Sequence, residues 1–312
     1  IFATASYSIT PKLTTQLGLN INKTQYDFRD LFNTGELNTS ANRNFKALLL
    51  PSIDVNYAFT PSYQLYGNIS RGFSNPSLEE TLTPNGIINP DIVQETGTNY
   101  ELGIEHKSED DRNRFEIAFY IMPINNLLVA KRVGDNQYIG RNAGKTKHQG
   151  IDLDWSYRFN VSNKITISPF ISYTYSNHKF LDFIDEEANE DYSDNALTGV
   201  PKNKINSGIQ TNFGNGLFFN ITHQYVDEIP LTDANTLYSD SFNLFNLKVG
   251  YKNQISEQLR IGLDFGINNF TDTKYAQSVL INASGFGGNA PRYFYPGNNI
   301  NYYGGLKLNY TL

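Results

Sequence analysis

Cysteine is absent from this sequence of 312 residues, and tryptophan and methionine each occur only once. Without cysteine the chain can form neither a disulfide framework nor a thiolate metal site, and the absence fits an oxidising compartment, where unpaired thiols are avoided. Long hydrophobic runs are also missing: the mean hydropathy is -0.44, and no stretch approaches the ~20 apolar residues of a membrane-spanning helix. The net charge of -6 argues against a nucleic-acid partner, which normally requires a basic face.

Aromatic residues are abundant, with 21 Tyr and 21 Phe, and they take part in a regular alternation. In the segment GIDLDWSYRF, Gly150–Phe159, every second residue is apolar and most of the others are strongly polar. Successive side chains of a strand point to opposite faces, so this strand has one apolar and one polar face. The apolar face could meet a protein core, as in a half-buried sheet, or lipid, as in a membrane barrel. Its members are Ile151, Leu153, Trp155, Tyr157 and Phe159.

The same alternation with a period of two recurs from end to end, and we find no convincing long helix. We count about thirteen strands, each long enough for the tilted spans of an outer-membrane barrel. Clear examples lie at residues 53–59, 115–121, 165–175, 245–251, 259–267 and 302–312.

The connections between these strands alternate strictly between short and long. The short ones, such as Gly214-Asn215-Gly216, contain the Pro, Gly, Asn and Asp residues of tight turns. A compact soluble domain rarely carries many long loops, whereas a transmembrane barrel has short periplasmic turns and long extracellular loops. We therefore predict a transmembrane antiparallel β-barrel of the all-β class whose apolar faces meet lipid. The long polar segments are 23–46, 73–94, 123–145, 177–201, 227–241 and 271–299.

The beginning of the sequence suggests a partial barrel. No secretory signal is visible, and Ile1 already lies in an alternating run. If short turns are periplasmic, the first and the last strand both descend toward the periplasm, which gives an odd number of strands. Bacterial single-chain barrels have even numbers. We therefore expect an odd number of strands to lie outside this sequence, so that residues 1–312 form one partial barrel domain.

No constellation of residues predicts an enzyme, a metal site or a cofactor. The four histidines are scattered without metal-ligand spacing. His148 and Asp152 share a face but lie about 13 Å apart along a strand, which is too far for a catalytic dyad. The acidic run Asp185–Asp194 and the glycines of Gly285–Gly288 both suit solvated loops better than a calcium or phosphate site. We predict neither catalytic residues nor metal ligands.

Basic and aromatic residues in or near the long loops are the candidates for ligand binding. Arginine together with tyrosine suits an anionic, aromatic ligand through charge and cation–π contacts. The alternative is an interfacial tyrosine girdle with structural ion pairs. The candidates are Arg71, Arg132, Tyr138, Arg141, Arg292 and Tyr293.

Several motifs, in order along the chain, resemble the TonB-dependent outer-membrane receptors. YGNISRGFSNPSLEET at Tyr66–Thr81 and NPDIVQETGTNYELGIEHK at Asn89–Lys107 resemble the family's mid-barrel signature. RNAGKTKHQGIDLDW at Arg141–Trp155 resembles its Asn-Ala-Gly strand. GINNFTDTKYA at Gly266–Ala276 and RYFYPGNNINYYGGLKLNY at Arg292–Tyr310 resemble its last strands. Together these matches cover about three quarters of the chain.

The resemblance implies the C-terminal part, ~13 strands, of a 22-stranded barrel with a plugged lumen, the plug itself lying outside this sequence. It implies active uptake of a scarce ligand, most often a ferric siderophore or another iron chelate. The energy would come from the TonB-ExbB-ExbD complex through the missing N-terminal part, and the location would be the bacterial cell outer membrane. Inward polar residues should then contact the plug, namely Asp152, Asp154, Arg158, Lys248 and Asp264.

Other readings remain open at this point. The same machinery imports cobalamin, other metal complexes and oligosaccharides in related receptors. A passive pore would require a barrel without a plug. A soluble propeller or solenoid would lack the asymmetry between long and short loops and would have polar outward faces, unlike Gly150–Phe159. A barrel enzyme is the weakest reading, because no catalytic dyad is assembled.

Overall fold

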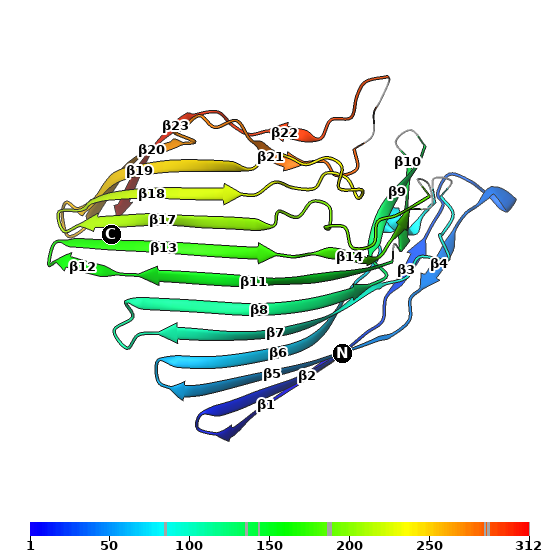
Figure 1. The fold of residues 1–312 in the computed structure, drawn as a ribbon, viewed down its shortest axis with the longest axis horizontal. Helices are drawn as coiled ribbons and strands as arrows, with labels where there is room; N and C mark the ends of the chain where they lie inside the picture. The colour runs from blue at the N-terminus through cyan, green and yellow to red at the C-terminus, as the bar shows by residue number, and fades with distance from the viewer. Residues whose placement is uncertain are drawn as a thin grey trace.

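The computed structural model describes residues 1–83, 86–134, 137–142, 144–185, 189–283, 285 and 288–311. Its main feature is a curved antiparallel sheet in which thirteen strands follow one another in chain order (Figure 1). The thirteen strands expected from the alternation are thereby confirmed. They are β1 (Phe2–Thr10), β2 (Leu13–Asn22), β5 (Leu48–Thr60), β6 (Tyr63–Ser74), β7 (Glu95–Lys107), β8 (Asn113–Asn125), β11 (Lys145–Tyr157), β13 (Ile165–Ser176), β17 (Asn203–Phe213), β18 (Leu217–Val226), β19 (Phe242–Gln254), β20 (Leu259–Asn268) and β23 (Asn301–Tyr310).

The sheet has two different ends. At one end the strands are joined by short turns, and at the other by long connections that hold the smaller elements (Figure 1). We call these connections, residues 23–47, 75–94, 126–144, 177–202, 227–241 and 269–300, the loop layer. Their limits agree with the predicted loops to within a few residues. The smaller elements are β3 (Gln25–Phe28), η1 (Gly35–Leu37), β4 (Ala41–Asn44), α1 (Leu78–Thr81), β9 (Leu128–Gly134), β10 (Gln137–Asn142), β14 (Lys179–Asp182), β15 (Ile184–Asp185), β16 (Glu190–Asp191), β21 (Ala276–Val279) and β22 (Phe294–Pro296), with β12 (Phe159–Ser162) at the turn end.

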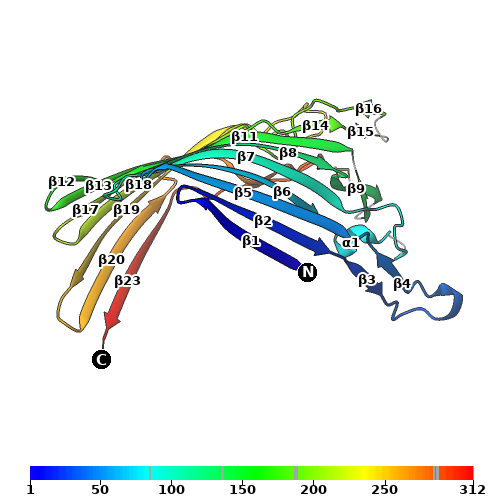
Figure 2. The same cartoon turned by 90° about the horizontal axis from the view of Figure 1, so that it is seen from below.

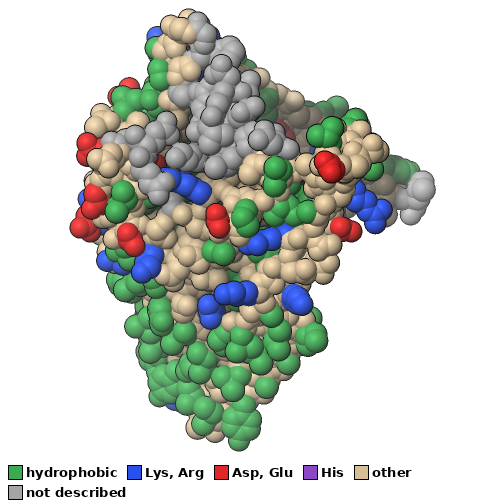
Figure 3. All heavy atoms as spheres, turned by 90° about the vertical axis from the view of Figure 1, so that its right-hand side faces the viewer, with side chains coloured by type: hydrophobic (Ala, Val, Ile, Leu, Met, Phe, Trp, Pro, Cys, Tyr) green, Lys and Arg blue, Asp and Glu red, His purple; other side chains and the backbone are tan. Residues whose placement is uncertain are grey.

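One face of the sheet is apolar, because the strand register places the alternating apolar residues side by side. Ile53 of β5 pairs with Ile69 of β6, which pairs with Tyr100 of β7, and Tyr100 pairs with Ile121 of β8. Many of these side chains are exposed in the isolated chain, as Leu263 is at 50%. Figure 3, which views the loop end, shows hydrophobic side chains gathered over one part of the surface, with charged side chains mainly above them. We call the sheet face that carries Ile53, Ile69, Tyr100 and Ile121 the apolar face. The predicted set beginning at Ile151 lies on the same face, because Ile151 pairs with Phe119 of β8.

The opposite, polar face is the crowded one. Five aromatic rings on it each cover the glycine directly across the neighbouring strand, and a Cβ on that glycine would meet the ring or nearby backbone. Side chains converge on the concave side of a curved sheet, so this crowding identifies the polar face as the inside of the arch that Figure 2 shows. The pairs are Tyr66 with Gly103, Tyr120 with Gly150, Phe170 with Gly208, Phe218 with Gly250 and Tyr303 with Gly266.

The most deeply buried apolar side chains belong to the loop layer rather than to the sheet. Ile92 and Leu231 are 1% and 0% exposed, and Phe180 and Phe183 stack with their ring centroids 4.6 Å apart. The partly buried Leu127 and other apolar residues pack on this phenylalanine pair. The sequence predicted long polar loops, and the structure adds that the loop layer has its own core and its own short strands.

The turn end of the sheet is held by aromatic stacking and by ion pairs. On the apolar face, Tyr57, Phe59, Tyr63 and His106 stack in a continuous row. Such a row is typical of an aromatic girdle at a membrane interface. In the turn between β7 and β8, Asp111 adopts a positive φ of 58° and its carboxylate binds Lys107 at 3.0 Å.

Candidate functional site: the polar face and the loop layer

The half of the polar face formed by β5 to β11 is acidic. Glu105 of β7 lies opposite Glu116 of β8, which in turn lies opposite Asp154 of β11, so three carboxylates stand abreast on three strands. Like charges directly across a sheet repel each other. Glu116 accepts a hydrogen bond from the Tyr66 hydroxyl at 2.9 Å, whereas Glu105 and Asp154 form no hydrogen bond or ion pair within the described part of the chain. The same half also carries Asp54, Glu101 and Asp152.

The half formed by β17 to β23 carries mainly cations on the polar face. Lys252 of β19 and Lys307 of β23 flank Gly262 of β20 at one level. Lys248 of β19 forms an ion pair of 3.1 Å with Asp264 of β20 and lies over the Tyr303 ring. The concave wall is therefore sorted by charge, negative on one side and positive on the other. The remaining cations of this half are Lys204 and Arg260.

The five residues predicted to face the lumen all lie on the polar face or at its turn end. Asp152 accepts a hydrogen bond from Thr174 at 2.7 Å, and Asp154 is exposed. Arg158 donates to the Asp111 carbonyl at 3.1 Å, so it links two neighbouring turns. Lys248 and Asp264 are brought together as partners, a pairing that the sequence did not predict because it depends on the register between β19 and β20.

A pair of histidines lies at the loop end of the polar face. The rings of His148 and His178 stack with centroids 4.5 Å apart and an interplanar angle of 12°. The Tyr120 hydroxyl lies 3.0 Å from His178 Nε2, and the buried Thr146 hydroxyl lies 3.2 Å from His148 Nε2. Sequence reasoning missed this cluster, because thirty residues separate the two histidines along the chain. Parallel stacked rings direct their nitrogen lone pairs along parallel planes, which does not suit two ligands of one metal ion.

The loops over β2 to β11 are tied together by hydrogen bonds from side chains to the backbone. Arg43 of β4 donates to the Ile92 carbonyl at 2.6 Å, and Asn89 donates to the Gly140 carbonyl at 2.8 Å. Asn142 at the end of β10 forms two hydrogen bonds with the backbone of Val93 in the neighbouring connection: its side chain accepts from Val93 N at 2.8 Å and donates to Val93 O at 3.0 Å. Three separate connections thus form one body.

The loops over β13 to β23 meet at Asp233. Its carboxylate accepts hydrogen bonds from the Thr198 hydroxyl and, at 3.0 Å, from the Asn282 amide. Its carbonyl accepts from Asn195 at 2.8 Å. Asn235 completes the node, because its side chain both accepts from and donates to the Ala196 backbone. Three loops are therefore joined at one side chain, through hydrogen bonds between residues that lie 35 to 49 positions apart in the sequence.

The structure distributes the predicted ligand-binding residues over different places. Arg71 lies on β6, two residues after Ile69 and on the same apolar face, so it points away from the polar wall. Arg132 and Tyr138 are paired across the β9–β10 hairpin, but their side chains lie outside the described part of the structure. Arg141 lies half-buried on β10. Arg292 is exposed between β21 and β22, and the adjacent Tyr293 packs on Phe294.

Two further features concern the chemistry of the site. Across the residues that the structure describes, no three His, Asp or Glu side chains are grouped closely enough to hold a metal ion. No helix within this part of the chain has the length and hydrophobicity to cross a membrane. Parts of two predicted loop segments, residues 186–188 of the acidic run and residues 286–287 of the glycine-rich run, lie outside the described residues.

The sheet is curved and antiparallel, with an apolar outer face, a polar inner face and long loops at one end only. These features define a transmembrane-type β-barrel wall. The family model "TonB dependent receptor-like, beta-barrel" matches residues 1–270. The chain therefore belongs to the TonB-dependent receptor family of outer-membrane barrels, as the motifs had suggested.

Solved structures of similar fold include proteins named as transporters and as receptors. The copper transporter OprC superposes with a TM-score of 0.72 at 16% identity, over 99% of this chain and 47% of that chain. The siderophore receptor PiuA from Acinetobacter baumannii gives 0.72 at 19% identity, over 97% and 41%. The ferric citrate transporter FecA gives 0.72 at 19% identity, over 95% and 43%. The present chain thus spans less than half the length of each of these proteins.

Proposed function

We propose that this chain forms part of the barrel wall of an outer-membrane receptor that takes up a scarce ligand by TonB-dependent transport, and that the ligand is an iron chelate. The observation that carries the proposal is a charge-sorted polar wall beneath an ordered loop layer, in a chain of the TonB-dependent receptor family. A protein named as a siderophore receptor and one named as a ferric citrate transporter are among the similar structures. Energy would come from the TonB-ExbB-ExbD complex, acting on a part of the receptor outside this chain.

The loops would make the first contact with the chelate. Arg141, Arg292 and Tyr293, together with Arg132 and Tyr138, supply the cationic and aromatic groups that an anionic chelate with aromatic rings would bind. Arg71 is left out of this role, because it lies on the apolar face. Asp152, Asp154, Arg158, Lys248 and Asp264 would face a domain that occupies the lumen.

The decisive experiment is growth of a strain that lacks the complete gene. Iron-starved cells are supplied with ferric citrate, a ferric catecholate or a ferric hydroxamate as the sole iron source. Growth should fail on one of these chelates, return with a plasmid copy, and fail equally in a strain without TonB. Normal growth on all three, with a defect on cobalamin or on a copper complex, would overturn the choice of iron. Uptake that persists without TonB would instead identify a passive pore.

The role of the lumenal residues is tested separately in the complete receptor. Reversal of charge at both Asp152 and Asp154 should weaken retention of the lumenal domain and reduce uptake, because the acidic half of the wall loses two negative charges. Reversal of Lys107, which lies at the turn end and is already paired with Asp111, serves as the control. Unchanged transport in the double variant would count against contact between this wall and a lumenal domain.

A further inference from the structure

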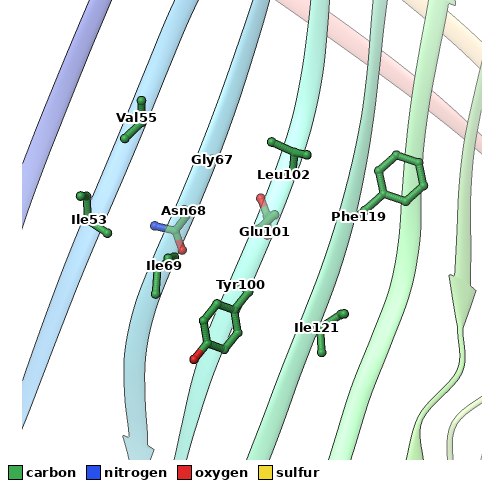
Figure 4. Close-up of a pocket in the computed structure, with 10 residues that line it drawn as sticks. All are labelled: Ile53, Val55, Gly67, Asn68, Ile69, Tyr100, Glu101, Leu102, Phe119 and Ile121. Atoms are coloured by element: carbon green, nitrogen blue, oxygen red, sulfur yellow. The ribbon is translucent and has the colours of Figure 1, made fainter.

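A groove on the apolar face is not used by the function proposed above. It has a volume of about 490 Å³ and is formed by β5, β6, β7 and β8. Gly67 of β6 lies at its centre, between Val55 of β5 and Leu102 of β7, as Figure 4 shows. The absence of a side chain at Gly67 interrupts the apolar surface and leaves the hollow. The other apolar residues of the lining are Ile53, Ile69, Tyr100, Phe119 and Ile121.

The groove is lined mainly by aliphatic side chains, together with Tyr100 and Phe119, and it opens on the apolar face. Leu102 and Phe119 beside it are 54% and 50% exposed, a large apolar exposure for neighbouring side chains. Such a surface normally marks contact with lipid or with another protein. In a barrel wall whose apolar face meets the membrane, the nearest matter that can fill an open apolar groove is a hydrocarbon chain.

A cation marks the loop end of the groove. Arg71 follows Ile69 by two residues on the same face, which places it about 7 Å further along β6 toward the loop layer. It is exposed and forms no hydrogen bond or ion pair within the described residues. A guanidinium group binds phosphate through two parallel hydrogen bonds. Between the groove and Arg71, the Tyr100 hydroxyl points toward the same end in Figure 4, as expected of a tyrosine at a membrane interface.

A second cation lies at the same level on β11. Lys147 pairs with Pro123 of β8, two residues beyond Ile121 and therefore also just outside the groove on the loop side. Three strand spacings of about 4.8 Å separate Arg71 from Lys147, roughly 14 Å. Two phosphates on one headgroup could reach both cations, whereas a single phosphate could reach only one.

We propose that this groove binds an acyl chain of a phosphorylated glycolipid from the outer leaflet of the membrane, with the phosphate held by Arg71 and a second phosphate near Lys147. The proposal rests on the outer-membrane location given above and does not depend on which ligand is transported. A lipid of the leaflet on the turn side would place its headgroup beside the aromatic row of Tyr57 to His106 instead. The described arginines of that end beside β7 and β8, Arg112 and Arg114, are already paired with Asp110 and Asp111.

Two variants test the two parts of the proposed lipid site, the groove and the cation beside it. In Gly67→Val a side chain fills the groove. It does so without strain, because a Cβ at Gly67 would meet only Glu101 O at 3.7 Å and Leu102 Cδ1 at 3.9 Å. Arg71→Gln removes the charge and leaves the groove intact. The matched controls are Gly304→Val, an outward glycine on β23 whose Cβ would meet only Asp264 O at 3.6 Å, and Arg112→Gln, an exposed arginine of the turn end.

The experiment measures lipid retention by the complete receptor. Purified receptor is stripped of lipid and mixed with diphosphorylated lipid A, with dephosphorylated lipid A or with phosphatidylglycerol, and bound lipid is counted by native mass spectrometry. We expect one retained molecule of diphosphorylated lipid A, a loss of about tenfold in Gly67→Val, and wild-type retention in both controls. Arg71→Gln should reduce retention of the diphosphorylated form toward that of the dephosphorylated form, and the remaining difference should reflect Lys147.

Three results would overturn the proposal. Equal retention by all variants would show that the groove does not select a lipid. Equal retention of phosphatidylglycerol would show that the site does not recognise the glycolipid. A receptor dimer that Gly67→Val dissociates would show that a second copy fills the groove. Uptake of the transported ligand should stay unchanged in Gly67→Val, so failure here is distinguishable from failure of the proposed function, and heat-modifiable gel mobility confirms that each variant folds.

Discussion

The sheet and the loop layer of this protein are stabilised in different ways. The sheet relies on a repeated backbone ladder and on aromatic rings that lie over glycines across the polar face. The loop layer relies on single Asn, Asp and Arg side chains, of which Asp233 and Asn142 each join segments distant in sequence. Regular structure distributes its stability over many equivalent contacts, whereas irregular structure concentrates it in a few. A destabilising substitution in a strand should therefore affect neighbouring strands, whereas one in the loop layer should affect only nearby residues.

The largest effect is expected in the sheet from Gly250→Val. A Cβ at Gly250 would collide with the Phe218 ring and would come within 2.6 Å of the Leu263 carbonyl, so the backbone must move. Overpacking of this kind costs about 3 kcal/mol. The fraction of folded receptor, measured by heat-modifiable gel mobility, should fall sharply. Gly67→Val, at an open position on the other face, is the matched control and should fold normally. Equal folding of the two variants would contradict the role assigned to the ring–glycine pairs.

In the loop layer, Asp233→Ala should have a smaller and strictly local effect. The variant removes the carboxylate that accepts from Thr198 and Asn282, a loss of about 2 kcal/mol for hydrogen bonds to a charged group. Amide hydrogen exchange should accelerate in residues 195–199 and 280–283 and stay unchanged in β17 to β20. Asp240→Ala, an exposed position of the same loop, is the control. Acceleration that spreads through the strands would contradict the separation between the two regions.

A still smaller and pH-dependent effect is expected at Asp30, in the connection between β3 and β4. Its carboxylate accepts hydrogen bonds from the Asn33 and Phe32 amides, both at 3.0 Å, and from Thr39. These bonds, led by that from Asn33, lower the pKa of Asp30 well below its usual value. A lowered pKa stabilises the loop above the unfolded value of about 3.9, and the stabilisation is lost as the pH falls through the folded pKa.

The measurement at Asp30 is the protection of the amides of Phe32, Asn33 and Thr39 against hydrogen exchange, relative to unstructured rates. Asp30→Ala should remove most of this protection at neutral pH, and acid should do the same to the unsubstituted protein below the usual carboxyl range. Asp27→Ala, whose exposed carboxylate lies 3.9 Å from Arg29, is the comparison. Protection that does not change with pH would show that the carboxylate does not organise this loop.

The smallest effect is expected from Lys248→Gln, which breaks the ion pair with Asp264. Both side chains are partly exposed, so the pair contributes only about 0.5 kcal/mol. A double-mutant cycle with Asp264→Asn, read by thermal unfolding, should give a coupling energy of that size. A coupling above about 2 kcal/mol would show that the polar face is far less hydrated than its exposure suggests.

Sequence patterns were sufficient for the sheet and insufficient for the loop layer, for a physical reason. Alternation depends only on consecutive residues, so Gly150–Phe159 alone identifies a strand with two different faces. Tight-turn residues likewise indicate where strands end. The contact of His148 with His178, the ion pair of Lys248 with Asp264 and the cover of Gly250 by Phe218 depend instead on register between strands. Asp233 and Asn142 read as ordinary solvated loop residues until their partners are known. The outward position of Arg71 could have been found by extending the alternation of β6 past Ile69.

The ring–glycine pairs also bear on how a body inside the proposed barrel would move. Each of these rings fills the space above a glycine, so a body inside the proposed barrel would meet a smoother concave wall. Few steric contacts would then oppose the movement of such a body along the strands. The resistance to such a pull would come chiefly from the attraction between opposite charges, which weakens as ionic strength rises.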